Sequence, residues 1–334
     1  MKFTNVTLFV VLKSLILGAI ATGSVNHSRI PAGAITVGNE GHYPNLTVAL
    51  NDTSSNVFYI YAGNYTGQTL ISRPNVTIYG ETWSPYSYLG NRVTLSVNMP
   101  ASQAGSNDLS GTVRIHATGV KFYNLDIENT YGQASVSILP TNILFTLTST
   151  ALASHPVSSD RAKRSSGEHK IPCLPIGVIK STLVLGLLVP WTSWIFGMYA
   201  SVWITKSVVE STGNGYLTAS GRNTSDAFWY VIDESAVIGN AKNQTYLGRP
   251  WRASARVVYQ KSYLGDNIKP EGWSQWQATD PRTTWILFGE YKNFGPGAWN
   301  ASTRPSFATK LNASIPIDTV LGSNYTKWVD IRHL

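Results

Sequence analysis

Short runs of β-forming residues recur along the first part of the chain and constrain its fold more than any other feature. They are rich in Val, Ile, Phe and Tyr, and turns of Gly, Asn, Pro and Ser separate them at intervals of about twenty residues. The runs are 35–37, 57–61, 76–79, 113–116 and 120–123, with one longer insertion at 80–112. No amphipathic helix of ordinary length lies between them. The pattern predicts an all-β solenoid of stacked coils, although a β-sandwich would fit nearly as well.

Composition narrows the class of protein. With 26 Lys and Arg against 18 Asp and Glu, the net charge of +8 suits an acidic polymer as partner. The basic residues are scattered rather than gathered in a stripe, so no nucleic-acid partner is expected. The single Cys173 rules out an intramolecular disulfide, so stability must come from a large core. The six histidines lack the spacing of metal ligands, and no Gly-X-Ser-X-Gly elbow occurs, so neither a metal, a cofactor nor a serine nucleophile is expected.

The N-terminus has the pattern of an export signal. Residues 1–23 carry Lys2 and an apolar run from Leu8 to Ala21 with small residues near its end, which is typical of a secretory signal peptide. Lys13 interrupts the run, so an uncleaved anchor is the alternative. Acceptor triplets for N-glycosylation also recur, at Asn26, Asn45, Asn51, Asn64, Asn75, Asn223, Asn243, Asn300, Asn312 and Asn324. We therefore expect a secreted, extracellular glycoprotein with one mature domain, 24–334.

The stretch from Tyr246 to Trp251 holds the first candidate functional residues. Arg249 stands between Gly248 and Pro250, and proline forces the residue before it into an extended conformation. A guanidinium held on such a stiff turn can bind a carboxylate through two hydrogen bonds, and Trp251 offers a flat face for a sugar ring. Taken alone, Gly-Arg-Pro is better explained as an ordinary turn with an exposed arginine.

This stretch, Tyr-Leu-Gly-Arg-Pro-Trp, resembles a motif of the pectin methylesterases (pectinesterases). The resemblance extends to 215–222 upstream and to 264–265, 270–273, 281–283 and 288–291 downstream, and in all it covers about 31–135 and 195–334. It implies a right-handed single-stranded parallel β-helix. It also implies hydrolysis of the methyl esters of homogalacturonan, the polysaccharide of pectin, to pectate and methanol without a cofactor, by a secreted monomer that acts on the cell wall.

The resemblance also implies roles for particular residues. Gln133, in the stretch 129–134, corresponds to a glutamine whose amide helps to form the oxyanion hole, although a solvated loop glutamine is the alternative. Arg249 would orient the nucleophilic aspartate, and Trp251 would line the sugar subsites. Trp273, Trp276 and Trp285 could extend that platform, with core packing as the favoured alternative for each. The tail from Ala301 is expected to pack across the solenoid or to cap it.

Between 136 and 194 the resemblance fails. The family uses one aspartate as nucleophile and a second carboxyl as acid and then base, but neither aspartate motif occurs here. Ile195-Phe196-Gly197 survives of the second motif, and Ser193 stands where its aspartate belongs. Codons can be chosen for residues 168–175 and 188–193 so that the same shifted reading frame encodes both aspartate motifs. Codons can also be chosen for Val136-Ser137 that match the start of an intron. We therefore expect that the segment carrying both catalytic aspartates is missing or frame-shifted.

Two alternatives to an active esterase remain open. The chain as written could be a non-catalytic pectin-binding β-helix protein that keeps the cleft without the chemistry. A membrane-anchored form is less favoured: the uncharged run from Ser181 to Thr205 has the length of a membrane span, but it ends inside the returning family pattern.

Overall fold

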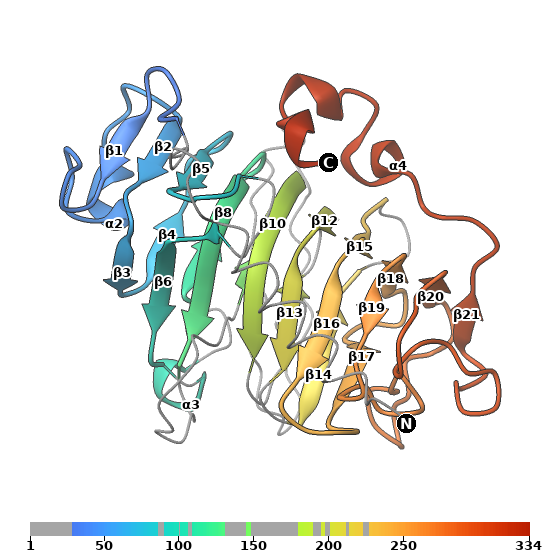
Figure 1. The fold of residues 1–334 in the computed structure, drawn as a ribbon. Helices are drawn as coiled ribbons and strands as arrows, with labels where there is room; N and C mark the ends of the chain where they lie inside the picture. The colour runs from blue at the N-terminus through green and yellow to red at the C-terminus, as the bar shows by residue number, and fades with distance from the viewer. Residues whose placement is uncertain are drawn as a thin grey trace, which may run out of the picture.

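The chain is wound into a solenoid of parallel strands that stack from β1 at one end to β21 at the other (Figure 1). The computed structural model describes residues 29–85, 90–99, 101–105, 109–130, 145–147, 180–189, 195–197, 201–211, 214–222 and 227–334. Strand pairing among the named strands of these residues is parallel throughout, and the strands form one 15-stranded and one 6-stranded sheet. Parallel pairing excludes the β-sandwich alternative, whose sheets are antiparallel.

The strands of successive coils form three faces. The first face contains β1 (Ile35–Val37), β2 (Val57–Ile60), β5 (Thr77–Gly80), β8 (Lys121–Asn129), β10 (Lys180–Val189), β12 (Ser201–Thr205), β15 (Tyr230–Asp233), β18 (Arg256–Gln260), β20 (Leu287–Tyr291) and β21 (Ala308–Lys310). The second face contains β3 (Gly63–Thr66), β6 (Val93–Val97), β13 (Val208–Ser211), β16 (Ala236–Gly239) and β19 (Tyr263–Leu264), and the long strands β8 and β10 join it to the first.

The third face is the 6-stranded sheet. Its strands are β4 (Thr69–Ile71), β7 (Val113–Ile115), β9 (Phe145–Leu147), β11 (Ile195–Gly197), β14 (Gly215–Ser220) and β17 (Thr245–Pro250). Short helices lie outside the coils: α2 (Leu46–Ala49), α3 (Ala101–Ala104), α4 (Ile317–Leu321), η2 (Tyr325–Lys327) and η3 (Ile331–His333). The five β-rich runs all form strands within a residue or two of the expected bounds, except that the last continues to Asn129. The insertion at 80–112 holds β6 and α3.

The core consists of side chains stacked in register from coil to coil. Phe58 lies opposite Ile78, and Ile78 lies opposite Phe122; all three are fully buried. Further along the solenoid Ile204 and Ile232 are paired in the same way. Because parallel register repeats the inward position once per coil, each coil adds apolar side chains that stabilise the fold by about 1.5–3 kcal/mol apiece.

A ladder of serines holds the corner between the first and second faces. At this corner one residue per coil adopts positive φ, as Glu234 does at 45°, and a serine follows it. The amide of Ser207 donates to the hydroxyl of Ser235 (3.2 Å), and the amide of Ser235 donates to the hydroxyl of Ser262 (3.1 Å). Each of these hydroxyls donates in turn to a carbonyl of its own coil. The corner thus satisfies buried polar groups without regular strand pairing.

At the C-terminal end of the solenoid a buried ion pair follows the apolar stack. Glu290 lies opposite Tyr259 in register and is 1% exposed. Its two oxygens accept from Arg304 Nε (2.7 Å) and Nη2 (3.0 Å), and Oε1 also accepts from Trp273 Nε1 (3.0 Å). Arg304 also donates to the carbonyls of Pro270 and Gly297. The carboxylate is therefore saturated, as a buried charge must be to avoid a large desolvation cost.

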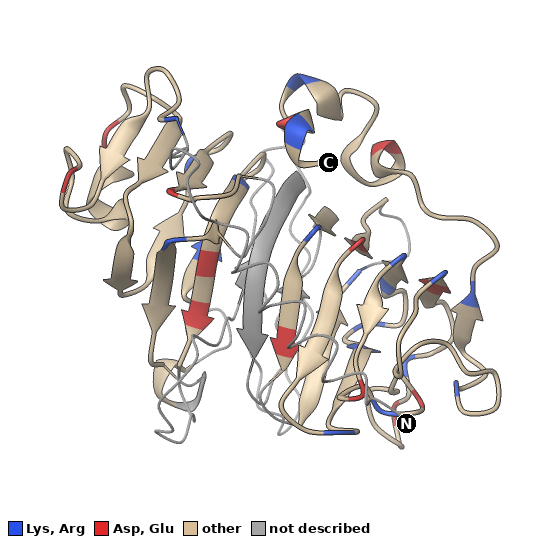
Figure 2. Ribbon diagram, viewed as in Figure 1, with Lys and Arg blue, Asp and Glu red and all other residues tan. Residues whose placement is uncertain are grey.

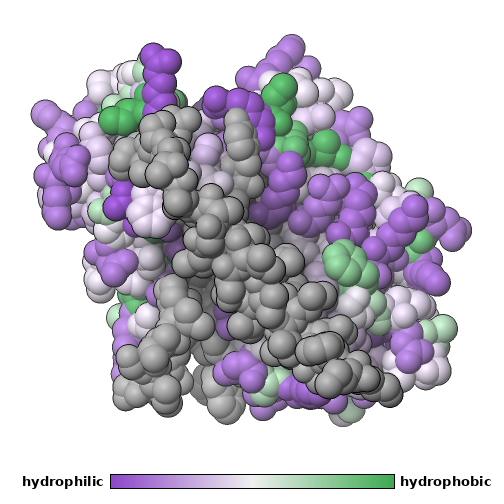
Figure 3. Space-filling model, in the orientation of Figure 1, coloured by the Kyte–Doolittle hydropathy of each residue, from purple (hydrophilic) through white to green (hydrophobic). Residues whose placement is uncertain are grey.

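The C-terminal tail crosses the outer surface of the first face, which confirms the first of the two expected placements. Val320, Leu321 and Val329 of the tail pack against Trp203, Val231 and Val258 of β12, β15 and β18. The visible surface in Figure 3 is mainly hydrophilic where it is described, with small separate hydrophobic patches. Lys and Arg are spread along the solenoid instead of forming one stripe (Figure 2).

The uncharged run from Ser181 to Thr205 contains strands, not a helix, wherever it is described: most of β10, then β11 and β12. In the part of the chain with described structure, no helix combines the length and the apolar character needed to cross a bilayer.

Candidate active site

Arg249 lies on β17, at the third face of the solenoid. Arg249 is paired in register with Ala219 on β14, and Ala219 is paired with Phe196 on β11. Phe196 belongs to the surviving Ile-Phe-Gly segment. The expected turn is wrong, because Gly248, Arg249 and Pro250 all lie in the strand; only the expected extended backbone at Arg249 is confirmed. The strand needs glycine at position 248, because a Cβ there would lie 2.1 Å from Thr218 Oγ1. The backbone at Arg249 is thus restricted by two features. One is Pro250, and the other is the close packing of β17 on β14.

The guanidinium of Arg249 is held between two aromatic rings. Its carbon lies 4.1 Å from the ring centroid of Tyr216 and 4.3 Å from that of Trp276. Tyr216 stacks in turn on Tyr246, with centroids 5.4 Å apart. Lys269 lies over Tyr246 and Arg282 over Trp276, at 4.8 and 4.6 Å. We call these six residues the aromatic–cation column; ring faces attract cations, so it is a stabilising arrangement.

Arg249 carries an unused donor inside this column. Its Nε is buried and has no hydrogen-bond partner, and no carboxylate forms an ion pair with it within the described ranges. Burial lowers the pKa of Arg249 from its usual value, and the neighbouring Tyr216 partly opposes that shift. Because a guanidinium stays protonated, a buried charge with an unused N–H is costly and is best satisfied by an anionic oxygen. The position is thus fitted to hold a carboxylate.

Arg282 fastens the loop that carries Trp276 to the turn after Arg249. It adopts φ of 55°, donates from Nη1 to the carbonyl of Trp251 and from Nε to Asp280 Oδ2 at 2.7 Å. Trp251 itself is half-buried, with the guanidinium carbon of Arg252 6.0 Å from its ring. The family-like segment 281–283 therefore serves to close the surface around Arg249.

The three remaining candidate tryptophans have different environments. Trp273 is 1% exposed and stacks on Phe288, so it belongs to the core. Trp276 belongs to the column, and Trp285 is 70% exposed. Core packing, the favoured alternative, is thus correct for Trp273 and wrong for Trp285.

Sequence reasoning missed Tyr216, Lys269 and Arg282. A signal for Tyr216 was present: Tyr216-Leu217 and Tyr246-Leu247 are the same dipeptide one coil apart, and parallel register stacks such positions. Lys269 and Arg282 lie on loops that return to the third face, and no sequence period marks them.

Other expected site residues cannot be placed. Gln133 and Ser193 lie outside the described residues, as does most of 136–194, where only the strands β9 and β10 are described. Within the described ranges, no three His, Cys, Asp or Glu side chains are grouped so that they could hold a metal ion.

Comparison with known proteins identifies the family. The family model for Pectinesterase matches residues 192–314, which include β11, β14, β17 and the whole column. The "Probable pectinesterase A" of Neosartorya fischeri is 32% identical over 342 residues, covering 96% of this chain and 99% of that protein. The "Pectinesterase" of Aspergillus aculeatus is 32% identical over 335 residues, covering 95% and 97%.

Solved structures give the same result for the fold. The pectin methylesterase of Aspergillus niger in deglycosylated form superposes with a TM-score of 0.68 at 30% identity, covering 91% of this chain and 99% of that one. The carrot pectin methylesterase, at 18% identity, shares the fold with a TM-score of 0.60 and covers 90% and 97%. These proteins are right-handed parallel β-helices, so the expected fold and its handedness are confirmed. From the matching motifs, the coverage of its relatives and the shared fold, the chain belongs to the pectinesterase family.

Proposed function

We propose that this protein acts as a pectinesterase at the third face, hydrolysing the C6 methyl esters of homogalacturonan to pectate and methanol without a cofactor. The observation that carries the proposal is the half-buried side chain of Arg249, whose buried Nε has no partner in the described part of the chain while two rings fix the plane of the guanidinium. Such a group is ready to hold a carboxylate in one orientation.

The reaction needs two carboxyl groups. One carboxylate attacks the ester carbonyl, the second carboxyl donates a proton to the departing methanol, and water then cleaves the acyl-enzyme. Arg249 would keep the nucleophile ionised and aimed, and the Gln133 amide would donate to the oxygen that becomes negative. The faces of Trp251 and Trp276 would support galacturonate rings. The positive guanidinium groups of the column suit a polymer whose free acid units are anionic.

The second candidate is a non-catalytic pectin-binding protein. It is favoured by one observation, that Ser193 occupies the position of the nucleophilic aspartate in the chain as written. A hydroxyl without an adjacent base cannot replace an ionised carboxylate. The column, by contrast, is complete, and it would bind the polymer with or without the chemistry.

The deciding experiment begins with the transcript across codons 130–200, read beside the genomic sequence. The protein that the transcript encodes is then assayed for methanol release from methylated pectin and for binding of methylated oligogalacturonides. Methanol release that falls sharply in Arg249→Lys supports the esterase. Binding without methanol release supports the binding protein, and a protein that shows neither refutes both.

Arg256→Lys is the matched control. This arginine lies as close to a tryptophan ring, 4.3 Å from Trp229, but on the first face. Its replacement should leave both methanol release and binding unchanged.

The cellular setting belongs to the same proposal. The signal-like residues 1–23 and the sequons support a protein that is secreted, glycosylated and monomeric, and that meets pectin outside the cell without a membrane anchor. Export should leave a mature domain 24–334. N-terminal sequencing of the secreted protein tests this, and an intact residue 1 in a membrane fraction would refute it.

A further inference from the structure

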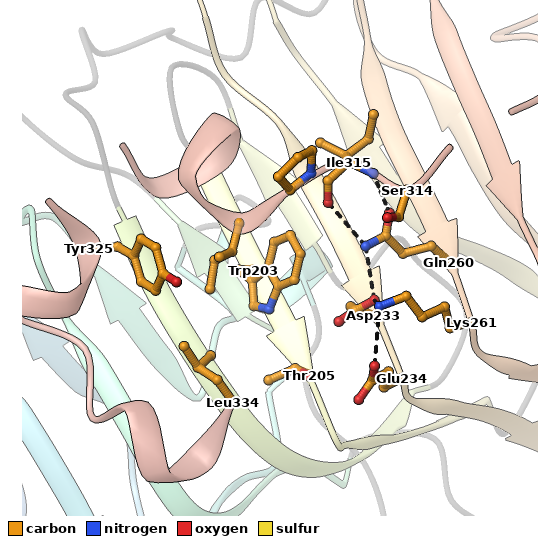
Figure 4. A pocket seen from close by; sticks show the side chains of 12 residues that line it. Trp203, Thr205, Asp233, Glu234, Gln260, Lys261, Ser314, Ile315, Tyr325 and Leu334 are labelled. Carbon is orange, nitrogen blue, oxygen red and sulfur yellow. Dashed lines mark hydrogen bonds and ion pairs between the residues drawn. The ribbon is translucent and has the colours of Figure 1, made fainter. Parts of the chain in front are cut away.

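A pocket of about 340 Å³ lies between the C-terminal tail and the outer surface of the first face (Figure 4). One wall is formed by strand residues, among them Trp203, Asp233 and Gln260, and the other by tail residues such as Tyr325 and Leu334. We call it the tail pocket. Arg249 lies on the third face, so the tail pocket is separate from the site described above. Its volume is at the lower end of the roughly 300–1,000 Å³ usual for ligand pockets.

Hydrogen bonds fix both walls of the tail pocket. The Gln260 side chain donates to Asp233 Oδ1 (2.9 Å) and to the carbonyl of Ile315 (3.2 Å), and its oxygen accepts from the amide of Ile315 (2.8 Å). Lys206 Nζ donates to the carbonyl oxygen of Leu334 at 2.6 Å, which holds the last residue of the chain. The pocket is therefore a built cavity with fixed walls.

The lining favours a neutral ligand that carries hydroxyls and at least one acceptor. Trp203 is only 5% exposed, and its indole Nε1 is buried without a hydrogen-bond partner. Two carboxylates, Asp233 and Glu234, face one ammonium, Lys261, at 3.6 and 3.2 Å. Burial raises the pKa of Asp233 in this setting. A uronate would add a third negative charge, whereas a neutral sugar can accept from the indole and donate to the carboxylates.

Two glycosylation sequons border the tail pocket. Ser314, the third residue of the sequon that begins at Asn312, and Tyr325, the middle residue of the Asn324 sequon, lie on opposite sides of the pocket in Figure 4. Asn324 is exposed, Thr326 is exposed, and the Asn324 side chain makes no capping hydrogen bond to η2. The Asn324 side chain is thus exposed, and the next residue, Tyr325, lines the pocket.

Several other sequons are less well placed. Asn45 Oδ1 accepts from the amide of Val48 and caps α2, and Asn300 Oδ1 accepts from both the amide and the hydroxyl of Ser302. Thr77, at the end of the Asn75 sequon, is buried in β5, with 8% of its surface exposed. Asn324 therefore differs from these sites in that its side-chain oxygen caps nothing, its sequon threonine is exposed, and a sugar-sized pocket is lined by the next residue, Tyr325.

We propose that Asn324 carries an N-linked glycan and that its first N-acetylglucosamine lies in the tail pocket. An oxygen of the sugar accepts from Trp203 Nε1, and its hydroxyls donate to Asp233 and Glu234. The modification joins Asn324 Nδ2 to C1 of the sugar, breaks the sugar–phosphate bond of a lipid diphosphate donor, and releases the lipid diphosphate with the amide proton. The seated sugar holds the tail on the first face. The inference rests on the proposed export but not on esterase activity.

The test uses the full-length protein secreted from a eukaryotic host, with glycopeptide mass spectrometry at each sequon and amide hydrogen exchange over residues 311–334. Wild type and Thr326→Ser, which keeps the sequon, should be occupied at Asn324. Asn324→Gln should raise exchange in the tail by about fivefold, the equivalent of one net hydrogen bond. Asn300→Gln, at an exposed sequon outside the pocket, is the matched control and should leave tail exchange unchanged.

A second variant tests the seat of the sugar separately from its attachment. Trp203→Phe removes the indole N–H but keeps an aromatic ring, so occupancy should persist while an endoglycosidase trims the Asn324 glycan faster than in wild type. Occupancy elsewhere but not at Asn324 would overturn the inference. So would equal trimming at Asn324 and Asn300 in native wild type. Absence of glycan at every sequon of the secreted protein would overturn the inference too. Failure of the host to secrete the chain would refute export, while methanol release reports on the esterase proposal independently.

Discussion

Removing Arg304 should expose how strongly the end of the solenoid depends on one buried ion pair. In Arg304→Met the carboxylate of Glu290, 1% exposed, loses both guanidinium donors and keeps only Trp273 Nε1 at 3.0 Å. Methionine fills a similar apolar volume, so the main loss is electrostatic. Breaking a buried pair from one side costs about 3–5 kcal/mol. For a chain of this size that corresponds to a Tm lower by roughly 10 °C.

Replacing Glu290 should lower the free energy of unfolding less than replacing Arg304, because Arg304 has other hydrogen-bond partners. In Glu290→Gln the guanidinium of Arg304 still donates to the carbonyls of Pro270 (2.8 Å) and Gly297 (2.7 Å). The double variant Glu290→Gln/Arg304→Met leaves no buried charge at all. With neither charge of this pair left unpaired, the double variant should be more stable than Arg304→Met alone.

Thermal scans followed by circular dichroism and by tryptophan fluorescence measure all three variants. Coincident transitions would show that one cooperative unit is being observed. The reasoning is refuted if Arg304→Met costs less than about 1 kcal/mol, the level of an exposed pair. It is also refuted if the double variant is no more stable than Arg304→Met.

Three further predictions concern the site and the tail. Arg249→Lys should lower the free energy of unfolding by about 1–2 kcal/mol in denaturant titrations, since it loses two ring-face contacts of about 0.5–1 kcal/mol each; unchanged stability would contradict the column's role. Gly248→Ala should destabilise by about 1–3 kcal/mol through overlap with Thr218 Oγ1, and adding Thr218→Ala should recover part of it in denaturant titrations. Burial raises the pKa of Asp233 in the folded state, so the stability of wild type relative to Asp233→Asn should be greatest below about pH 3.9 and fall as pH rises; a pH-independent difference would exclude this.

The coil architecture could be predicted because its determinants are local and repeat. Runs such as 57–61 and 120–123 bear inward side chains at positions that stack in register, and polar turns end each run. Pattern alone could not choose between parallel and antiparallel pairing, since both bury alternate residues. The family motif made that choice, and the parallel registers agree with it.

The site was predictable in part, for a related reason. Arg249 and Trp251 could be singled out because they lie in a contiguous family motif, whereas Gly-Arg-Pro alone favoured an ordinary turn. The rings that enclose the guanidinium come from elsewhere: Tyr216 from the previous coil and Trp276 from a loop beyond β17. Contacts between residues far apart in sequence depend on how loops return to a face, and no local signal encodes that.

The register of β8 with β10 has a consequence for the fate of the protein in a cell. These strands are paired over Phe122 to Glu128, although residues 130–179 separate them in the chain. In a solenoid each coil is held by its immediate neighbours, so an insertion between two coils costs little once their edges meet. Quality control in a secretory pathway inspects exposed apolar surface and leaves catalytic competence untested. If the segment between β8 and β10 is frame-shifted as the sequence predicts, the coils on either side would still give such inspection nothing to reject, and only an assay with substrate would reveal the lost chemistry.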